Sequence, residues 1–203
     1  SKQIKICNGA FVNSFVENIF IPSDFIYLGS EWCLQTPYLK NVSISPKNKQ
    51  FIYDAENKFL LKKSDLNYDN YDVILFTPRD TKKVVIPSYV KKIAPCAFQC
   101  CEFLRSIEFE KNSKLELIDD FVFYGTAIEK IIIPPQVKKI GNLSFAVCEN
   151  LKSVSFSDDS KLEVIDENVF DCSSIESFYI PSSVKMIGSY AFSCNDQLKI
   201  VEI

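Results

Sequence analysis

The sequence predicts a β-rich repeat solenoid, a stack of similar coils that each contribute one short parallel strand. The phrase IPxxVxxI begins at Ile86, Ile133 and Ile180, at intervals of 47 residues. A second phrase, which contains SKLExI, starts at Ser106 and Ser153, again 47 residues apart. The two phrases alternate, so the ends of successive strands lie 23 or 24 residues apart. A period in the low twenties is typical of a solenoid in which each coil is one supersecondary unit.

Eight apolar segments indicate the strands of this stack. In LRSIEF at 104–109, Leu104, Ile107 and Phe109 should point inward, and the polar residues between them should point outward. A proline follows the strand in each IP-type copy and ends it, because proline cannot donate a hydrogen bond to a ladder. The strand segments are 16–21, 39–44, 82–86, 104–109, 128–133, 151–156, 175–180 and 198–203.

Each coil then closes on its convex side with a pair such as Ala-Phe or Val-Phe, which we expect to form a short helical turn. The recurring ring should be buried and should stack on its equivalent in the next coil. Seventeen phenylalanines against one tryptophan and one methionine agree with a core that repeats one kind of ring. The rings are Phe98, Phe123, Phe145, Phe170 and Phe192.

One interval does not fit the period. Ile44 and Ile86 lie 42 residues apart, nearly two coils, and no IPxxVxxI phrase lies between them. Apolar runs at 50–53 and 59–62 flank a polar turn, which favours a degenerate coil with a protruding β-hairpin. The alternative is a disordered loop, which would expose these apolar residues. We therefore describe one solenoid domain, 1–203, with N-terminal coils at 1–44, an irregular hairpin insertion at 45–81 and regular coils at 82–203.

The repeats resemble the BspA-like leucine-rich repeats found in surface proteins of mucosa-dwelling bacteria and protozoan parasites. The resemblance rests on three copies of IPxxVxxI in fixed phase and covers nearly the whole chain. It implies a right-handed leucine-rich-repeat superhelix. It also implies a role in attachment to host matrix or partner proteins, although repeat folds serve many unrelated partners.

Composition narrows the classes of function. A net charge of −3 gives no broad electrostatic reason to bind nucleic acid or an anionic membrane. The absence of histidine excludes Ser-His and Cys-His nucleophile pairs and histidine-ligated zinc. Five glycines form no phosphate-binding motif, and the acidic pairs Asp119–Asp120 and Asp158–Asp159 read as solvated loop residues. We therefore expect no catalytic residue, no cofactor and no metal.

The residue four positions before each strand end forms an outward column whose charge alternates in the regular coils. In-register stacking would place its members about 4.8 Å apart, as a ladder of opposite charges. Each exposed pair contributes roughly 0.2–1 kcal/mol. This charged ladder either maintains register and solubility or contributes to a partner site. Its members are Arg105, Glu129, Lys152, Glu176 and Lys199.

The residue directly before each strand end forms a second column, which is apolar in every IP-type coil and polar in every SKLE-type coil. Its apolar members would form a spaced stripe on the concave face, bordered by charge. Such a stripe is typical of a protein-binding surface. The alternative interpretation is β propensity alone, since strands favour these residue types. The apolar stripe consists of Phe20, Val85, Ile132 and Tyr179.

The eight cysteines follow the repeat phase. Cys101 and Cys148 share one repeat position, whereas Cys100, Cys172 and Cys194 share another. Recurrence at a repeat position indicates small buried free thiols. A disulfide between neighbouring coils, with Cys172 and Cys194 as the best pair, and a metal site are the alternatives.

These observations predict a non-catalytic protein-binding repeat module that acts in adhesion or in recognition of host or partner proteins. An intracellular scaffold or regulatory module is the alternative. The expected partner is an extracellular-matrix protein, a host surface protein or another protein, with no nucleic acid and no membrane insertion. The array begins within a coil and stops on a strand at Ile203, so we also expect self-association through its ends. The resemblance implies a cell-surface or secreted protein, with the cytoplasm as the alternative.

Overall fold

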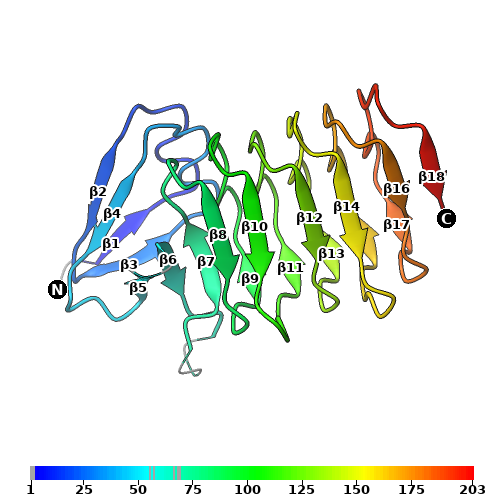
Figure 1. Ribbon diagram of the computed structural model, residues 1–203. Coiled ribbons are helices and arrows are strands. Elements are labelled where there is room, and N and C mark those ends of the chain that lie inside the picture. Colours follow the sequence, from blue (N-terminus) through cyan, green and yellow to red (C-terminus); the bar gives the residue numbers. More distant parts are fainter. Residues whose placement is uncertain (1–2, 55, 57, 66, 68–69) are drawn as a thin grey trace.

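The computed structural model describes residues 3–54, 56, 58–65, 67 and 70–203. These residues form one stack of β-rich coils, with the two ends of the chain at opposite ends of the stack (Figure 1). The predicted right-handed repeat solenoid is confirmed.

One side of the stack, which we call the front sheet, contains a strand in each of the eight predicted segments. Residues alternate along these strands between the core and the exposed front face, as in β8, where Val84 and Ile86 are buried and Val85 is exposed. In Figure 1, the strands of this sheet from β8 onward lie nearer the viewer than the strands on the opposite side of the stack. The strands are β2 (Asn18–Ile21), β4 (Asn41–Ile44), β8 (Lys83–Ile86), β10 (Ser106–Phe109), β12 (Lys130–Ile133), β14 (Ser153–Phe156), β16 (Ser177–Tyr179) and β18 (Ile200–Glu202).

The front sheet is not continuous but consists of four parallel pairs, β2–β4, β8–β10, β12–β14 and β16–β18. Each pair joins an IP-type coil to the SKLE-type coil that follows it, across the 23-residue step of the sequence. The 24-residue steps, from β10 to β12 and from β14 to β16, carry no such ladder. We attribute the interruption to the one extra residue, which shifts the backbone out of the register that a ladder requires.

A back sheet was missed by the sequence analysis, because the expectation of one strand per coil is wrong. Each regular coil up to β17 adds a second strand of two residues, formed by the apolar end of its IPxxVxxI or SKLExI phrase. The back sheet has the order β17-β15-β13-β11-β9-β7-β6-β5, and β1 (Ile4–Ile6) pairs separately with β3 (Phe25–Leu28). Its members are β5 (Phe51–Asp54), β6 (Phe59–Lys62), β7 (Val73–Phe76), β9 (Lys92–Ile93), β11 (Leu117–Ile118), β13 (Lys139–Ile140), β15 (Val164–Ile165) and β17 (Met186–Ile187).

The turns that close the coils are not helical in the described part of the chain, so the expectation of short helical turns is wrong. Each regular turn contains two residues with a left-handed backbone, four positions apart, such as Cys96 with φ 61° and Cys100 with φ 58°. A left-handed residue breaks a right-handed helix. Instead, Cys96, Phe98 and Cys100 each donate an N–H to a carbonyl of the next coil at 3.0–3.1 Å. The turns therefore form a third backbone ladder that links the coils.

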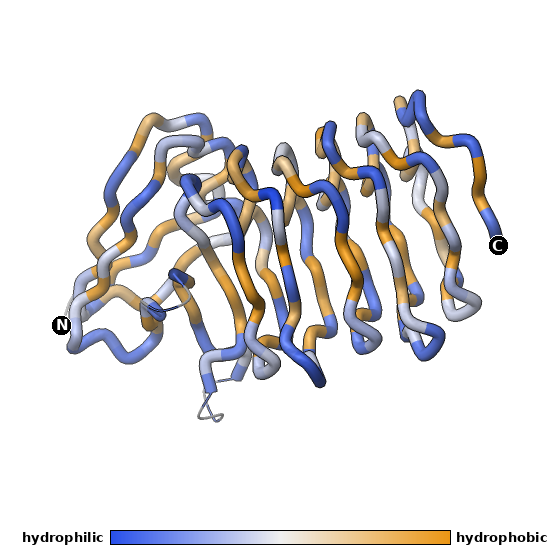
Figure 2. Tube along the Cα trace, in the orientation of Figure 1, coloured by the Kyte–Doolittle hydropathy of each residue, from blue (hydrophilic) through white to orange (hydrophobic). Residues whose placement is uncertain are grey.

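The predicted column of phenylalanine rings is confirmed as the centre of the core. Successive rings lie 5.2, 5.1, 5.5 and 5.4 Å apart between centroids, in near-parallel stacks. The first four are fully buried, whereas Phe192 in the last complete turn is half-buried. Apolar residues recur at equivalent places of successive coils in Figure 2. The rings are Phe98, Phe123, Phe145, Phe170 and Phe192.

The irregular segment forms an antiparallel hairpin of β5 and β6, which continues the back sheet instead of protruding from it. Strand β7 pairs antiparallel with β6 on one side and parallel with β9 on the other. All four residues of β7 are buried. Ile74 packs in the core of the regular array, whereas Val73 and Leu75 pack in a second core with the N-terminal coils. The segment is therefore a divider with an apolar surface on both faces, which explains why its strands lack polar alternation.

Arg79 follows the divider and is only 2% exposed. Its guanidinium lies over the ring of Phe76, 4.8 Å from the centroid. It donates hydrogen bonds to the carbonyl oxygens of Cys33 at 3.4 Å, Cys96 at 3.1 Å and Ala97 at 3.2 Å. Cys33 belongs to the N-terminal coils and the other two residues belong to the regular array. Arg79 therefore clasps the two regions across the divider.

Candidate functional site on the front face

The structure exposes all four residues of the predicted apolar stripe on the front face. Phe20 is 65% exposed, Val85 38%, Ile132 67% and Tyr179 58%. Each is the outward residue of a strand whose inward neighbours fill the core, so exposure follows from strand alternation and not from loose packing.

Polar residues separate the members of the stripe. On the paired strand, Ser43 lies beside Phe20, Glu108 beside Val85, Ser155 beside Ile132 and Glu202 beside Tyr179. Because apolar residues occur only in every second coil, their spacing in the regular array is about 10 Å, twice the distance between paired strands. The arrangement offers isolated apolar contacts within a polar surface. Such a surface stays soluble and still provides anchor points for a partner.

The charged ladder forms only in part. Arg105 Nη1 lies 3.6 Å from Glu129 Oε1, with both side chains largely exposed. Farther along, the backbone of the column stacks as expected, since Lys152 N donates to Glu129 O at 2.9 Å and Lys199 N to Glu176 O at 3.0 Å. Within the described residues, no further ion pair joins two members of this column. Its remaining charges face solvent and are available to a partner.

A second charged column, along the edge of the back sheet, was missed by the sequence analysis. Lys138 Nζ lies 2.8 Å from Glu116 Oε2, and Lys185 Nζ lies 3.1 Å from Glu163 Oε1. The signal in the sequence was the residue before each short back strand, which alternates between glutamate and lysine. These pairs join each SKLE-type coil to the IP-type coil that follows it, where the front ladder is interrupted.

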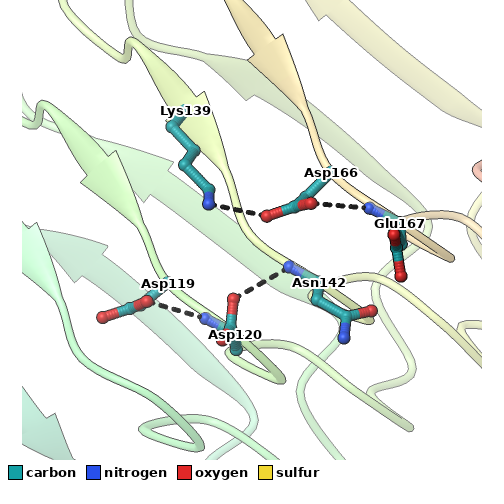
Figure 3. A network of polar contacts seen from close by, with 6 residues as sticks. All are labelled: Asp119, Asp120, Lys139, Asn142, Asp166 and Glu167. Atoms are coloured by element: carbon teal, nitrogen blue, oxygen red, sulfur yellow. Dashed lines mark hydrogen bonds and ion pairs between the residues drawn. The ribbon is translucent and has the colours of Figure 1, made fainter. Parts of the chain in front are cut away.

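Figure 3 shows how acidic turn residues join coils at the other edge of the back strands. Lys139 Nζ lies 2.6 Å from Asp166 Oδ2, and Asp120 Oδ1 accepts the backbone N–H of Asn142 at 2.9 Å. A Cβ at Gly141 would lie 2.5 Å from Asp120 Oδ1, so only glycine allows this close approach. The expectation that Asp119–Asp120 is a solvated pair is therefore wrong, because these side chains hold neighbouring coils.

The pKa values of the two carboxyl groups shift in opposite directions. Burial disfavours the ionised form of Asp120, and it is the main reason why the pKa of Asp120 is raised above 3.8, with a smaller contribution from the charge of Asp119. Burial would also raise the pKa of Asp166, but the hydrogen bond from Lys139 and the N–H of Glu167 together hold that pKa below 3.8.

Further exposed aromatic residues lie outside the predicted stripe. Phe15 is 80% exposed and stacks on Tyr38 with 5.6 Å between ring centroids. Phe103 is 57% exposed at the position that corresponds to Tyr38 in the regular array. The sequence analysis missed these aromatic residues because it considered only the outward positions within the strands. Each of the three instead directly precedes the inward valine or leucine with which its strand segment begins.

The comparisons with known proteins identify the repeats. Residues 1–66 and 74–199 match the BspA type leucine-rich repeat region in six copies. The chain belongs to this family. No curated protein sequence matches the chain.

Three solved structures of leucine-rich-repeat proteins are similar to this BspA-type chain. The pneumococcal vaccine antigen PcpA is 26% identical with a TM-score of 0.58, and the alignment covers 91% of this chain and 40% of the antigen. A leucine-rich repeat protein from Eubacterium ventriosum is 22% identical with a TM-score of 0.69, covering 94% and 62% of the two chains. A leucine rich cell surface protein from Faecalibacterium prausnitzii is 23% identical with a TM-score of 0.52, covering 97% and 42%. The chain thus spans about two fifths to three fifths of these proteins.

The cysteines of this BspA-type array divide into two groups. Four are buried, namely Cys33, Cys96, Cys101 and Cys148. Burial raises the pKa of the Cys101 and Cys148 thiols to about 11, which keeps them protonated and inert. Cys100 is half-buried, and Cys7, Cys172 and Cys194 are exposed. The expectation of buried thiols therefore holds for half of the cysteines.

Two surface hollows lie away from the front-face stripe. One of about 170 Å³ is lined by Tyr27, Phe51 and Lys62 among others. Another of about 350 Å³ lies among the turns, where Gly125 leaves space between Cys100 and Val147. No helix in the described part of the chain is long and apolar enough to cross a membrane. The residues of the front-face stripe line neither of these two hollows.

Proposed function

We propose that this chain is a non-catalytic protein-binding repeat module, which contacts a partner protein through the front face. The observation that carries the proposal is the exposure of Phe20, Val85, Ile132 and Tyr179 among polar and charged neighbours. These side chains would supply the apolar anchors, and the exposed charges of Lys152 and Lys199 would orient the partner protein on the front face.

The biological setting that we propose is adhesion or recognition of a host or partner protein at the cell surface. Two similar structures support this setting, since one is a vaccine antigen and the other is described as a cell surface protein. The proposed partner is an extracellular-matrix or host surface protein.

An intracellular scaffold is the second candidate, and one observation favours it. All eight cysteines are free thiols in the structure, and disulfides are usual where extracellular domains need additional stability. The same front face would then bind a cytosolic protein.

The first prediction tests the front face through the double variant Ile132→Ser/Tyr179→Ser. Saturable binding of the labelled chain to immobilised extracellular matrix should fall at least about tenfold, because two of the four anchors are lost. The melting temperature should change little, since both side chains are exposed. Light scattering of both proteins, over a range of concentrations, would show whether binding is affected through self-association.

Tyr190→Ser is the matched control, because Tyr190 is 73% exposed but lies on a turn. It should leave binding unchanged. Normal binding by the double variant would assign the stripe to β propensity alone. Absence of matrix binding by the unmodified chain would reject adhesion and leave the scaffold role.

A further inference from the structure

Three groups that can bind a metal ion converge on the last two complete turns. The Sγ atoms of Cys172 and Cys194 and a carboxylate oxygen of Asp171 all lie within 4.8 Å of one another. Cys172 Sγ lies 3.7 Å from Asp171 Oδ1. Two thiolates and a carboxylate around a tetrahedral zinc ion would lie about 3.6–3.8 Å apart, given metal–ligand distances of about 2.0–2.3 Å. The three groups are therefore close to ligand spacing before any ion binds.

The backbone around these groups is well fixed. Cys172 N donates to Ser193 O at 3.0 Å, and the side chain of Asn195 donates to Phe170 O at 2.6 Å. These bonds hold the two turns in register, one coil apart. In addition, Ser193 Oγ donates to Cys194 Sγ at 3.6 Å, a contact that would orient and stabilise a thiolate ligand. Both cysteines are exposed, so an ion can reach them.

Other coils do not repeat this arrangement. The corresponding turn positions hold Cys100, Gly125 and Val147 in the three preceding coils. Cys100 therefore has no cysteine at the equivalent place of the following coil. The sequence analysis paired Cys172 with Cys194 through the coil period only as a possible disulfide, and it did not recognise Asp171 as a third group beside them.

We propose that Asp171, Cys172 and Cys194 form a surface site for a thiolate-preferring cation such as Zn²⁺, with solvent or a partner residue as the fourth ligand. Binding releases the two thiol protons to solvent. A disulfide between the two cysteines would need no third group, so Asp171 is the feature that favours metal. The proposal is independent of the role proposed for the front face.

The second prediction is a titration of the reduced, desalted protein with Co²⁺, followed by displacement with Zn²⁺. We expect one equivalent of Co²⁺ with a thiolate-to-metal absorption band, which Zn²⁺ abolishes. Cys172→Ser and Cys194→Ser should each lose the band, and Asp171→Asn should weaken binding. Cys7→Ser/Cys100→Ser is the matched control and should keep it, because Cys7 is exposed and Cys100 is half-buried outside the site.

Circular dichroism of each variant distinguishes loss of the site from loss of folding. The four substituted cysteines are exposed or half-buried, so each position should tolerate serine. The proposal is overturned if the folded, fully reduced protein shows no thiolate band. It is also overturned if Asp171→Asn binds as tightly as the unmodified protein, or if protein isolated without reductant contains a Cys172–Cys194 disulfide.

Discussion

The N-terminal coils and the regular array solve the same problem, holding one coil on the next, in different ways. In the regular array the same core and turn contacts recur, with rings at 5.1–5.5 Å and a backbone ladder on each turn. Across the divider, the ring of Trp32 lies 5.7 Å from Phe76, and Arg79 supplies hydrogen bonds to carbonyl groups from both sides.

The difference shows what replaces repetition when it is interrupted. In the regular array a column of apolar rings joins the coils, whereas at the junction of two unlike coil surfaces a buried arginine adds hydrogen bonds to carbonyl groups on both sides. The five N–H groups of arginine can satisfy several acceptors at once, which one apolar residue cannot do. A buried arginine thus links two arrays of different geometry.

The third prediction breaks this junction and has the largest expected effect. Arg79→Ala should reduce the free energy of unfolding by about 3–5 kcal/mol, because it leaves a cavity and removes three hydrogen bonds to buried carbonyl groups. Hydrogen exchange should show that residues 18–44 open first while β10 to β16 stay protected. Arg79→Met refills most of the volume, so its remaining loss, about 1–3 kcal/mol, measures the missing hydrogen bonds. Equal protection loss across the whole chain would contradict a local clasp.

The fourth prediction addresses the regular array through its central ring. Phe145→Ala should cost about 3–5 kcal/mol, since Phe145 is fully buried between two other rings. Phe192→Ala is the matched control and should cost clearly less, because Phe192 is half-buried. Urea denaturation measures both. A loss below about 1 kcal/mol for Phe145→Ala would mean that the ring column does not carry the stability of the array.

The fifth prediction compares the two acidic contacts and has the smallest effect. The pKa of Asp166 is lowered, so its ionised form stabilises the fold at neutral pH, and that stabilisation is lost as the pH falls below 3.8. Asp166→Asn should therefore cost about 0.5–1 kcal/mol near pH 7, and the difference should vanish in acid.

Asp120→Asn should have the opposite sign. The pKa of Asp120 is raised, so ionisation above 3.8 opposes folding, whereas an asparagine oxygen can still accept from Asn142 N. Asn8 already makes this contact in the N-terminal coils, where its Oδ1 accepts from Ser30 N at 3.0 Å. The variant should be neutral or slightly more stable near pH 7. A pH-independent loss, measured by denaturation across this range, would refute the assignment.

The sequence predicted the features that recur at one period. Phe145 was placed in the core and Ile132 on the surface correctly, because both follow directly from the position in the repeat. The short back strands were missed since two residues, such as Lys92–Ile93, carry no alternation to detect. The left-handed turns were missed because they occur at Cys96 and Leu143, residue types that give no signal for a positive φ.

The role of acidic residues could not be predicted for another reason. Asp120 and Asp158 look alike in the sequence, yet Asp120 bonds to a neighbouring coil and Asp158 is exposed. Only the close approach at Gly141 separates them, and it depends on which coil follows. By contrast, the repeat period already placed Cys172 and Cys194 in neighbouring coils, and only the third group, Asp171, was missed.

Because the two coil types alternate, it matters whether an odd or an even number of coils is added to the array or removed from it. Removal of the single coil that contains Glu163 would bring Lys138 against Lys185, so two like charges would replace a pair of opposite charge. Removal of two adjacent coils, 47 residues, would bring Glu116 against Lys185 and preserve every kind of contact. Such an array can lengthen or shorten by gene duplication or deletion only in even steps without mispairing. The inherited unit is therefore the pair of coils, and designed versions of this array should be cut and extended in multiples of that pair.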